Sequence, residues 1–152
     1  MLKVALVHPE IPFNAGNVAR TCAAAGAELH LVAPLGFSVS ERRLRRAGMD
    51  YWERARPRIH ESLAAFLSFI KEDAVLAFSA EAPRAHWDAP FAEDSWLVFG
   101  CESRGLPQEL RARWAERTYR IPMAPGERSL NLSSAAAVVV YEARRRSPGP
   151  LA

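Results

Sequence analysis

The densest group of polar side chains lies directly before the most apolar run of the chain. Arg128-Ser129-Leu130-Asn131-Leu132-Ser133-Ser134 precedes residues 135–141, AAAVVVY. One polar side chain is enough to cap a helix N-terminus, and each further polar group that is buried there needs a partner. Capping and helix–backbone bonding account for one or two of these side chains. The remainder indicates a site that holds a ligand.

A second group lies in residues 14–20, NAGNVAR. Asn17 and Arg20 are three residues apart and can share one face of a helix. A guanidinium with two amides nearby can hold a phosphate. The alternative is that Asn14 caps the helix and Arg20 is an ordinary surface residue. The spacing leaves both interpretations open.

The third group is Gly100-Cys101-Glu102-Ser103-Arg104-Gly105-Leu106-Pro107. Its two glycines have the spacing of a phosphate-binding P-loop, but Leu106-Pro107 stand where that motif requires Lys and then Ser or Thr. The chain also contains no Gly-x-Gly-x-x-Gly, which disfavours ordinary dinucleotide binding. What remains is a tight turn whose glycines let a ligand approach the backbone, with Glu102 at its rim, or a plain turn with a surface acid.

These groups follow segments that alternate between strand and helix patterns. Strands are expected at 2–7, 29–33, 74–78, 96–99 and 119–121, and helices at 14–25 (with Asn14 as a candidate N-cap), 40–47, 62–71, after Pro107, and from Leu130 to Arg146. Strands that are apolar on both faces and alternate with helices predict an α/β fold with a mostly parallel sheet. Ligands of such sheets bind at the carboxyl ends of the strands, where all three groups lie.

Composition favours a cytoplasmic globular protein. The 152 residues are 49% hydrophobic and 24% charged, and we expect one domain over residues 1–146 with a flexible tail over 147–152. The longest apolar run is too short to cross a membrane, and no signal-peptide pattern is visible. The four histidines are scattered and the two cysteines form no Cys-x-x-Cys, so neither a metal site nor a disulfide is predicted.

Charge is distributed unevenly. Seven arginines and three acids lie between Glu41 and Arg58. Such a segment is either a solvated helix face or a surface that binds a polyanion.

Together the three groups resemble the three motifs of the SPOUT superfamily of RNA methyltransferases: Asn-x-Gly-Asn-x-x-Arg, Gly-x-Glu-x-x-Gly-Leu-Pro, and Ser-Leu-Asn-Leu-Ser before an apolar helix. The segments 9–12 (PEIP), 44–51 (LRRAGMDY) and 140–143 (VYEA) resemble the branch that methylates the ribose at the tRNA wobble position. The resemblance extends to about Arg145. Cys101 stands where that branch commonly has proline, and Ala15 where it often has threonine.

The resemblance implies a C-terminal deep trefoil knot, a homodimer with Tyr141 in the contact, and S-adenosylmethionine as the cofactor. The residues that match the family's cofactor site are Phe78, Gly100, Ile121, Ser129 and Leu130. The matching catalytic group is Arg20, surrounded by Asn14, Glu102 and Asn131.

The implied activity is 2′-O-methylation of a cytidine or uridine at the wobble position, on the anticodon stem-loop of tRNA, with no metal and no membrane. Arg20 would polarise the hydroxyl and clamp the adjacent phosphate, because a guanidinium stays protonated. Glu102 is another candidate proton acceptor. Under this resemblance the arginines of residues 42–46 become an RNA contact. Two alternatives stay open: another position in ribosomal or transfer RNA, and an RNA-binding module without activity.

Overall fold

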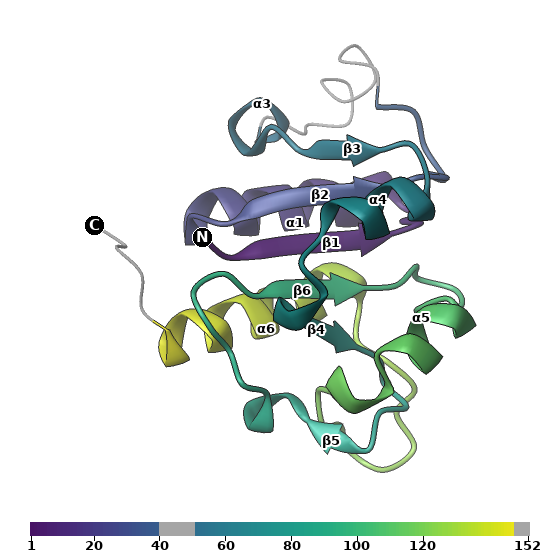
Figure 1. Cartoon of the computed structure of the whole chain (residues 1–152), viewed down its shortest axis with the longest axis vertical. Helices are drawn as coiled ribbons and strands as arrows, with labels where there is room; N and C mark the ends of the chain where they lie inside the picture. The colour runs from purple at the N-terminus through teal and green to yellow at the C-terminus, as the bar shows by residue number, and fades with distance from the viewer. Residues whose placement is uncertain (40–50, 148–152) are drawn as a thin grey trace.

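A sheet of seven strands forms the frame of the protein (Figure 1). The computed structural model describes residues 1–39 and 51–147. In chain order the strands are β1 (Lys3–Val7), β2 (Glu28–Val32), β3 (Arg58–His60), β4 (Val75–Phe78), β5 (Arg84–Ala85), β6 (Trp96–Phe99) and β7 (Thr118–Arg120). They lie in the order β3-β2-β1-β6-β4-β7-β5, and every pairing between them is parallel. The predicted parallel α/β fold is confirmed, and the knot stays a prediction.

Helices cover both faces of this sheet. They are α1 (Pro12–Ala25), α3 (Trp52–Ala55), α4 (Leu63–Phe69), α5 (Gln108–Arg113) and α6 (Leu132–Arg146), with single 3₁₀ turns at Glu72–Ala74, His86–Asp88 and Ala115–Arg117. Figure 1 shows α1 and α6 behind the sheet and α4 and α5 in front of it. The helix expected at 40–47 lies outside the described residues. Within the part of the chain that is described, no helix is long and apolar enough to span a bilayer.

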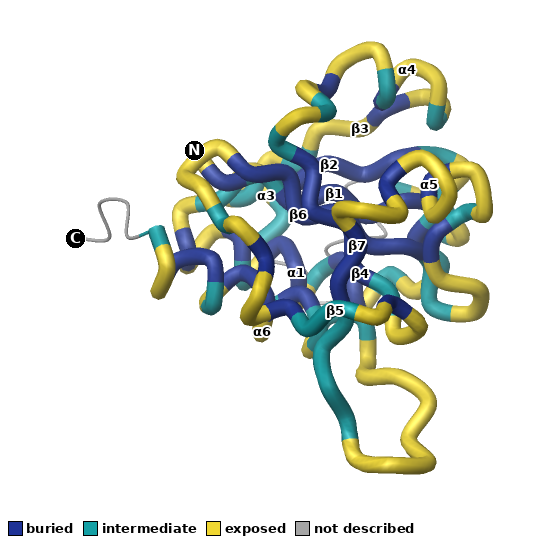
Figure 2. The backbone as a smooth tube through the Cα atoms, turned by 60° about the horizontal axis from the view of Figure 1, so that its bottom comes forward, coloured by how far each residue is buried: buried dark blue, intermediate teal, exposed yellow. Residues whose placement is uncertain are grey.

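Alternation along each strand divides the core into two layers. In β6, Leu97 and Phe99 pack with α1 and α6, whereas Trp96 and Val98 pack with α4 and α5. Both sets are buried because successive side chains of a strand point to opposite faces. Figure 2 shows the result as dark blue strands enclosed by more exposed helices and loops. Each such buried large apolar side chain contributes roughly 1.5–3 kcal/mol to folding.

The starts of the two longest described helices differ from the sequence predictions. α1 begins at Pro12 after the extended Ile11, so the prediction that Asn14 caps it is wrong. Proline suits a first helical position because its φ is fixed and it has no N–H to satisfy. α6 begins at Leu132 with Asn131 as its N-cap, rather than at Leu130. The helix expected after Pro107 begins at Gln108, with Pro107 as the residue before it.

The short elements at the edges were not predicted. β5 has two residues, β3 has three and α3 has four. Each contains an arginine and lacks an apolar run. For β3 and β5 the reason is that an edge strand buries little surface and needs only a few ladder hydrogen bonds. Their positions depend on the neighbouring strands, which the local sequence does not reveal.

Arg144 fixes the C-terminal ends of α1 and α6 side by side. Its Nε donates to the carbonyl of Ala25 at 2.7 Å and its Nη2 to that of Gly26 at 2.6 Å. The side chain is buried and supplies a cation to the last turn of α1, where free carbonyls favour one. Arg144 therefore caps a helix other than its own, which a basic run at the end of α6 did not indicate.

Two histidines are buried together on the face of the sheet that α4 covers. The Nδ1 of His30 lies 2.9 Å from the Nε2 of His60, and the rings of Phe66, Phe69 and Trp96 pack around the pair. Burial, followed by the charge of His60, lowers the pKa of His30 to about 4. Burial, followed by the charge of Arg58, also lowers the pKa of His60.

We expect the free energy of unfolding to decrease as the pH falls from about 6.5 towards 4. Both histidines are neutral in the folded protein, so below their ordinary pKa of 6.5 the unfolded chain binds more protons. Arg113 holds the pKa of Glu72 at about 2. The stability that Glu72 adds is therefore lost only at lower pH, below its ordinary pKa of 4.5, and does not affect the slope between pH 6.5 and 4.5. Urea unfolding at several pH values measures the slope. H30Q, which keeps a hydrogen-bonding side chain but does not titrate, should flatten it. Equal slopes for both proteins would contradict this account.

Candidate functional site

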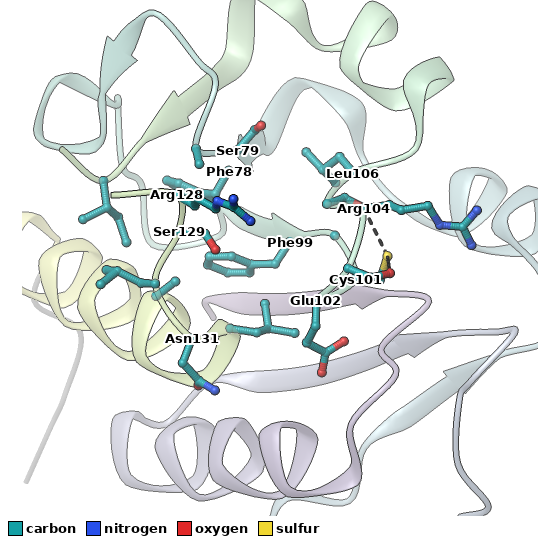
Figure 3. Close-up of a pocket in the computed structure, with 18 of the residues that line it drawn as sticks. Phe78, Ser79, Phe99, Cys101, Glu102, Arg104, Leu106, Arg128, Ser129 and Asn131 are labelled. Atoms are coloured by element: carbon teal, nitrogen blue, oxygen red, sulfur yellow. Dashed lines mark hydrogen bonds between the residues drawn. The ribbon is translucent and has the colours of Figure 1, made fainter. Parts of the chain in front are cut away.

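A pocket of about 460 Å³ opens at the carboxyl ends of β4, β6 and β7 (Figure 3). Three loops meet there: residues 79–81 after β4, residues 100–106 after β6, and residues 121–131 between β7 and α6. This is the edge at which parallel sheets bind ligands, and the volume is within the usual range for a small-molecule site.

The structure brings nearly all of the predicted site residues together. The lining includes Asn14, Phe78, Gly100, Glu102, Ile121, Ser129, Leu130 and Asn131. The exception is Arg20, which lies outside the lining on an exposed turn of α1. Its guanidinium carbon is 4.7 Å from the centre of the Tyr51 ring, a cation–π distance. Sequence alone did not indicate Tyr51 as its partner, because the contact joins separate segments.

A chain of side-chain hydrogen bonds joins the three motifs. The Nδ2 of Asn14 donates to Oε1 of Glu102 at 2.9 Å, and its Oδ1 accepts from Nδ2 of Asn131 at 2.9 Å. The Oδ1 of Asn131 in turn accepts from the backbone N–H groups of Ser133 and Ser134. Asn14 is buried, so losing either partner would leave a desolvated amide. Asn131 therefore caps α6, and it also lines the pocket.

Glu102 uses its carboxylate to cap the start of α1. Its Oε2 accepts from the backbone N–H of Glu10 at 2.8 Å, and its Oε1 accepts from that of Ile11 at 3.1 Å. With the bond from Asn14, three donors face the carboxylate. A carboxylate at a helix N-terminus satisfies free N–H groups and complements the helix dipole. These contacts favour a positioning role for Glu102 over the proton-acceptor role considered from the sequence.

The turn after β6 depends on a glycine at position 100. A Cβ there would overlap the backbone of Gly105 and Leu106. Cys101 and Gly105 exchange backbone hydrogen bonds at 3.1 and 2.9 Å, which brings the chain back across Gly100. Gly105 has a φ of 67°, a conformation open to glycine at little cost. The two glycines therefore let the two ends of the turn pack backbone against backbone beside the pocket.

Gly100→Ala should destabilise the protein by about 3 kcal/mol or more, because the clash is with backbone that cannot move aside. The change should also abolish ligand binding in any fraction that folds. Gly126→Ala is the comparison: Gly126 also lies in a pocket loop, and a Cβ there would meet nothing within 4 Å. Its φ of 92° disfavours a side chain, so this change should cost only about 1–2 kcal/mol from backbone strain. Chemical denaturation of both variants measures the difference, and an equal loss of stability would show that the crossing at Gly100 is not the cause.

Apolar and basic groups line different parts of the pocket. Phe78 and Phe99 line it with their rings stacked, 5.0 Å apart between centres, and Leu106, which is buried in the core layer on the other face of the sheet, lines it as well. The arginines 104, 111 and 128 also line it, and Arg111 pairs with Glu81 at 3.0 Å. Figure 3 shows Arg128 near the stacked rings, whereas the side chain of Arg104 extends away from them. Phe99, buried at the end of a predicted strand, was not singled out from the sequence.

Together these parts describe a site for a ligand with one flat apolar portion and a polar remainder. Flat rings fit apolar walls with a few backbone hydrogen bonds, which the loop after β6 and the 121–131 loop supply. Among residues 1–39 and 51–147, no three or more His, Cys, Asp or Glu side chains are grouped to hold a metal ion.

The model of the SpoU rRNA Methylase family matches residues 1–141. The chain belongs to this family. A relative from Burkholderia cenocepacia, a tRNA (cytidine(34)-2′-O)-methyltransferase, is 48% identical over 150 residues, which are 97% of this chain and 96% of the relative.

Solved structures of the SpoU family have the same fold. A structure that describes 2′-OH methylation of C/U34 on tRNA superposes with a TM-score of 0.87 at 52% identity, covering 96% of this chain and 90% of the other. The rRNA methyltransferase of Sinorhizobium meliloti, solved with AdoMet bound, superposes with a TM-score of 0.78 at 29% identity, covering 95% of this chain and 56% of the other. The SPOUT resemblance is thereby confirmed.

Proposed function

We propose that this SpoU methylase transfers a methyl group from S-adenosylmethionine to the ribose 2′-hydroxyl of the wobble nucleotide, cytidine or uridine, in tRNA. The observation that carries the proposal is the pocket in which the three family motifs meet. The Burkholderia relative matches over nearly the full length of both chains and is named for this reaction at cytidine 34. A tRNA substrate is consistent with the cytoplasm, which we propose as the compartment.

The pocket suits S-adenosylmethionine because its polar contacts can come from the main chain. Gly100 in the turn after β6 and Ile121, Ser129 and Leu130 in the third loop all line the pocket, and we assign the cofactor's polar contacts to the main chain of these two loops. We assign the adenine to the apolar wall near Phe78. When bound, the cofactor supplies an electrophilic methyl group on a sulfonium. The protein must hold the ribose oxygen in line with that methyl, and such alignment provides much of the rate.

Arg20 is assigned to the RNA instead of the cofactor, because it lies outside the pocket lining. Its guanidinium can donate to the 2′-oxygen and to the neighbouring phosphate at once. Packing against the Tyr51 ring limits the directions that it samples. Asn14, Glu102 and Asn131 keep the loops in register beside the ribose through their hydrogen-bond chain.

The anticodon stem-loop is the part of tRNA that we propose as the partner. The described end of the basic segment contributes Arg54, Arg56 and Arg58, all exposed. Arg54 also approaches the Tyr51 ring, at 6.0 Å, which places a second cation beside Arg20. Arginines 42, 43, 45 and 46 lie outside the described residues. Phosphate contacts of this kind supply sequence-independent affinity.

Purified protein should transfer labelled methyl from S-adenosylmethionine to tRNA, and Arg20→Ala should slow the transfer about a hundredfold or more, as expected for a lost transition-state donor. Cofactor affinity, measured by calorimetry, should stay unchanged in that variant. Full turnover by Arg20→Ala would contradict the role given to Arg20.

The position of methylation is tested with a tRNA that carries a single 2′-deoxynucleotide at the wobble position. This tRNA should accept no methyl, while a 2′-deoxy substitution at a neighbouring position should be tolerated. Methylation of the wobble-deoxy tRNA, or of ribosomal RNA in its place, would favour another RNA position. Absence of cofactor binding by the wild-type protein would favour a binding module without activity.

We also propose a homodimer that forms through α6. Val138 and Tyr141 are three residues apart on one helix face and are 41% and 50% exposed, whereas Val139 and Val140 are fully buried against the sheet. An apolar pair left on the outer face of a core helix is typical of an association surface. Phe13, 62% exposed on the neighbouring α1, adds apolar area to the same helical layer.

Tyr141→Ala should shift the protein from dimer towards monomer at micromolar concentration in light scattering, because an aromatic side chain is a frequent anchor of interfaces. Tyr141→Phe should keep the dimer if ring burial is the main contribution. A wild-type protein that is monomeric at high concentration would rule out the dimer.

A further inference from the structure

Two glutamates from different loops each accept hydrogen bonds from the other's loop beside the pocket. Glu102, after β6, accepts from the backbone N–H groups of Glu10 and Ile11. Glu10, before α1, points the other way and accepts from the backbone N–H of Ser103 at 2.9 Å and from its hydroxyl at 2.7 Å. Each carboxylate therefore binds the backbone of the segment that carries the other.

The backbone that presents Glu10 is held on its other side. His8 has a φ of 55°, and the carbonyl of Pro9 accepts from the N–H of Gly36 at 2.9 Å. A Cβ at Gly36 would come within 2.7 Å of the Glu10 Cα, so the two segments touch without a side chain between them. The Glu10 carboxylate consequently projects from a fixed base.

The turn that Glu10 holds is the one that borders the pocket. Residues 100–106 all line the pocket, whereas Glu10 does not. Within the turn, Cys101 and Gly105 bond only to each other through their backbone, which sets its shape but not its orientation towards α1. That orientation comes from the bonds of Glu10 to Ser103 and of Glu102 to the start of α1.

We propose that Glu10 is a positioning residue that holds the 101–105 turn against α1 and thereby sets the affinity of the pocket for the cofactor. Its cap also keeps Glu102 where it meets Asn14, the middle of the hydrogen-bond chain. The two bonds from Ser103 lower the pKa of Glu10, so the charged carboxylate, the stronger acceptor, is the form present at neutral pH. The cofactor part of this inference rests on the proposed function.

The test compares Glu10→Ala and Glu10→Gln with Glu93→Ala. Glu93 is an exposed carboxylate that precedes β6, at the end of that strand opposite to the pocket, so its loss controls for the change of charge. We measure affinity for S-adenosylhomocysteine by calorimetry and hydrogen exchange at the Ser103 amide. Glu10→Ala should weaken binding about tenfold and speed exchange at Ser103, as expected when bonds to a charged acceptor are lost. Glu10→Gln retains one acceptor oxygen and should recover about half of that loss on a logarithmic scale. Glu93→Ala should change neither measurement.

Unchanged affinity and unchanged Ser103 exchange in a folded Glu10→Ala would overturn the proposal. If Glu10→Ala does not fold, Ser103→Ala removes the hydroxyl bond alone and should give an intermediate loss of affinity, and wild-type affinity in that variant would count against the proposal. Should the wild-type protein bind no S-adenosylhomocysteine, the proposed function fails, and Ser103 exchange still decides whether Glu10 holds the turn.

Discussion

The buried amide of Asn14 is the interaction on which the arrangement of the site depends. It donates to Glu102 and accepts from Asn131, which lie 88 and 117 positions away along the chain, so three distant segments meet at one side chain. Because the amide is desolvated, either bond lost leaves a polar group without a partner. Such a constraint couples the loop after β6 to the start of α6, and a shift of one would move the other.

The packing of α6 on α1 also holds the three loops in place. Asn131 joins the N-terminal ends of the two helices, and Arg144 joins their C-terminal ends. Between these ties, buried alanines and valines of α6 pack into the layer that α1 shares. Small side chains let two helices approach closely. The third loop is therefore held at one end by β7 and at the other by α6, which is tied to α1 at both of its ends.

Much of the fold followed from local patterns, because buried parallel strands leave continuous apolar runs in the sequence. The strand at 96–99 was predicted with its observed bounds. Of the two interpretations of Asn14, the helix cap is wrong, and the side chain instead bonds to Glu102 and Asn131. Contacts between distant segments, such as Arg20 on Tyr51 or Glu10 on Ser103, leave no periodic signal. They were found only once the chain was folded.

The two glutamates also show why an acid in a binding loop need not act on protons. Glu102 accepts three hydrogen bonds and Glu10 accepts two. The bonds from Ser103 lower the pKa of Glu10. In both glutamates the acceptor oxygens are already used to hold the loops together. Methyl transfer to a hydroxyl still requires that a proton leave. The described carboxylates nearest the pocket rim are better suited to hold the loops in place than to accept that proton. In the proposed function, Arg20 stabilises the charge that develops on oxygen, and release of that proton to solvent then requires no further group from these loops.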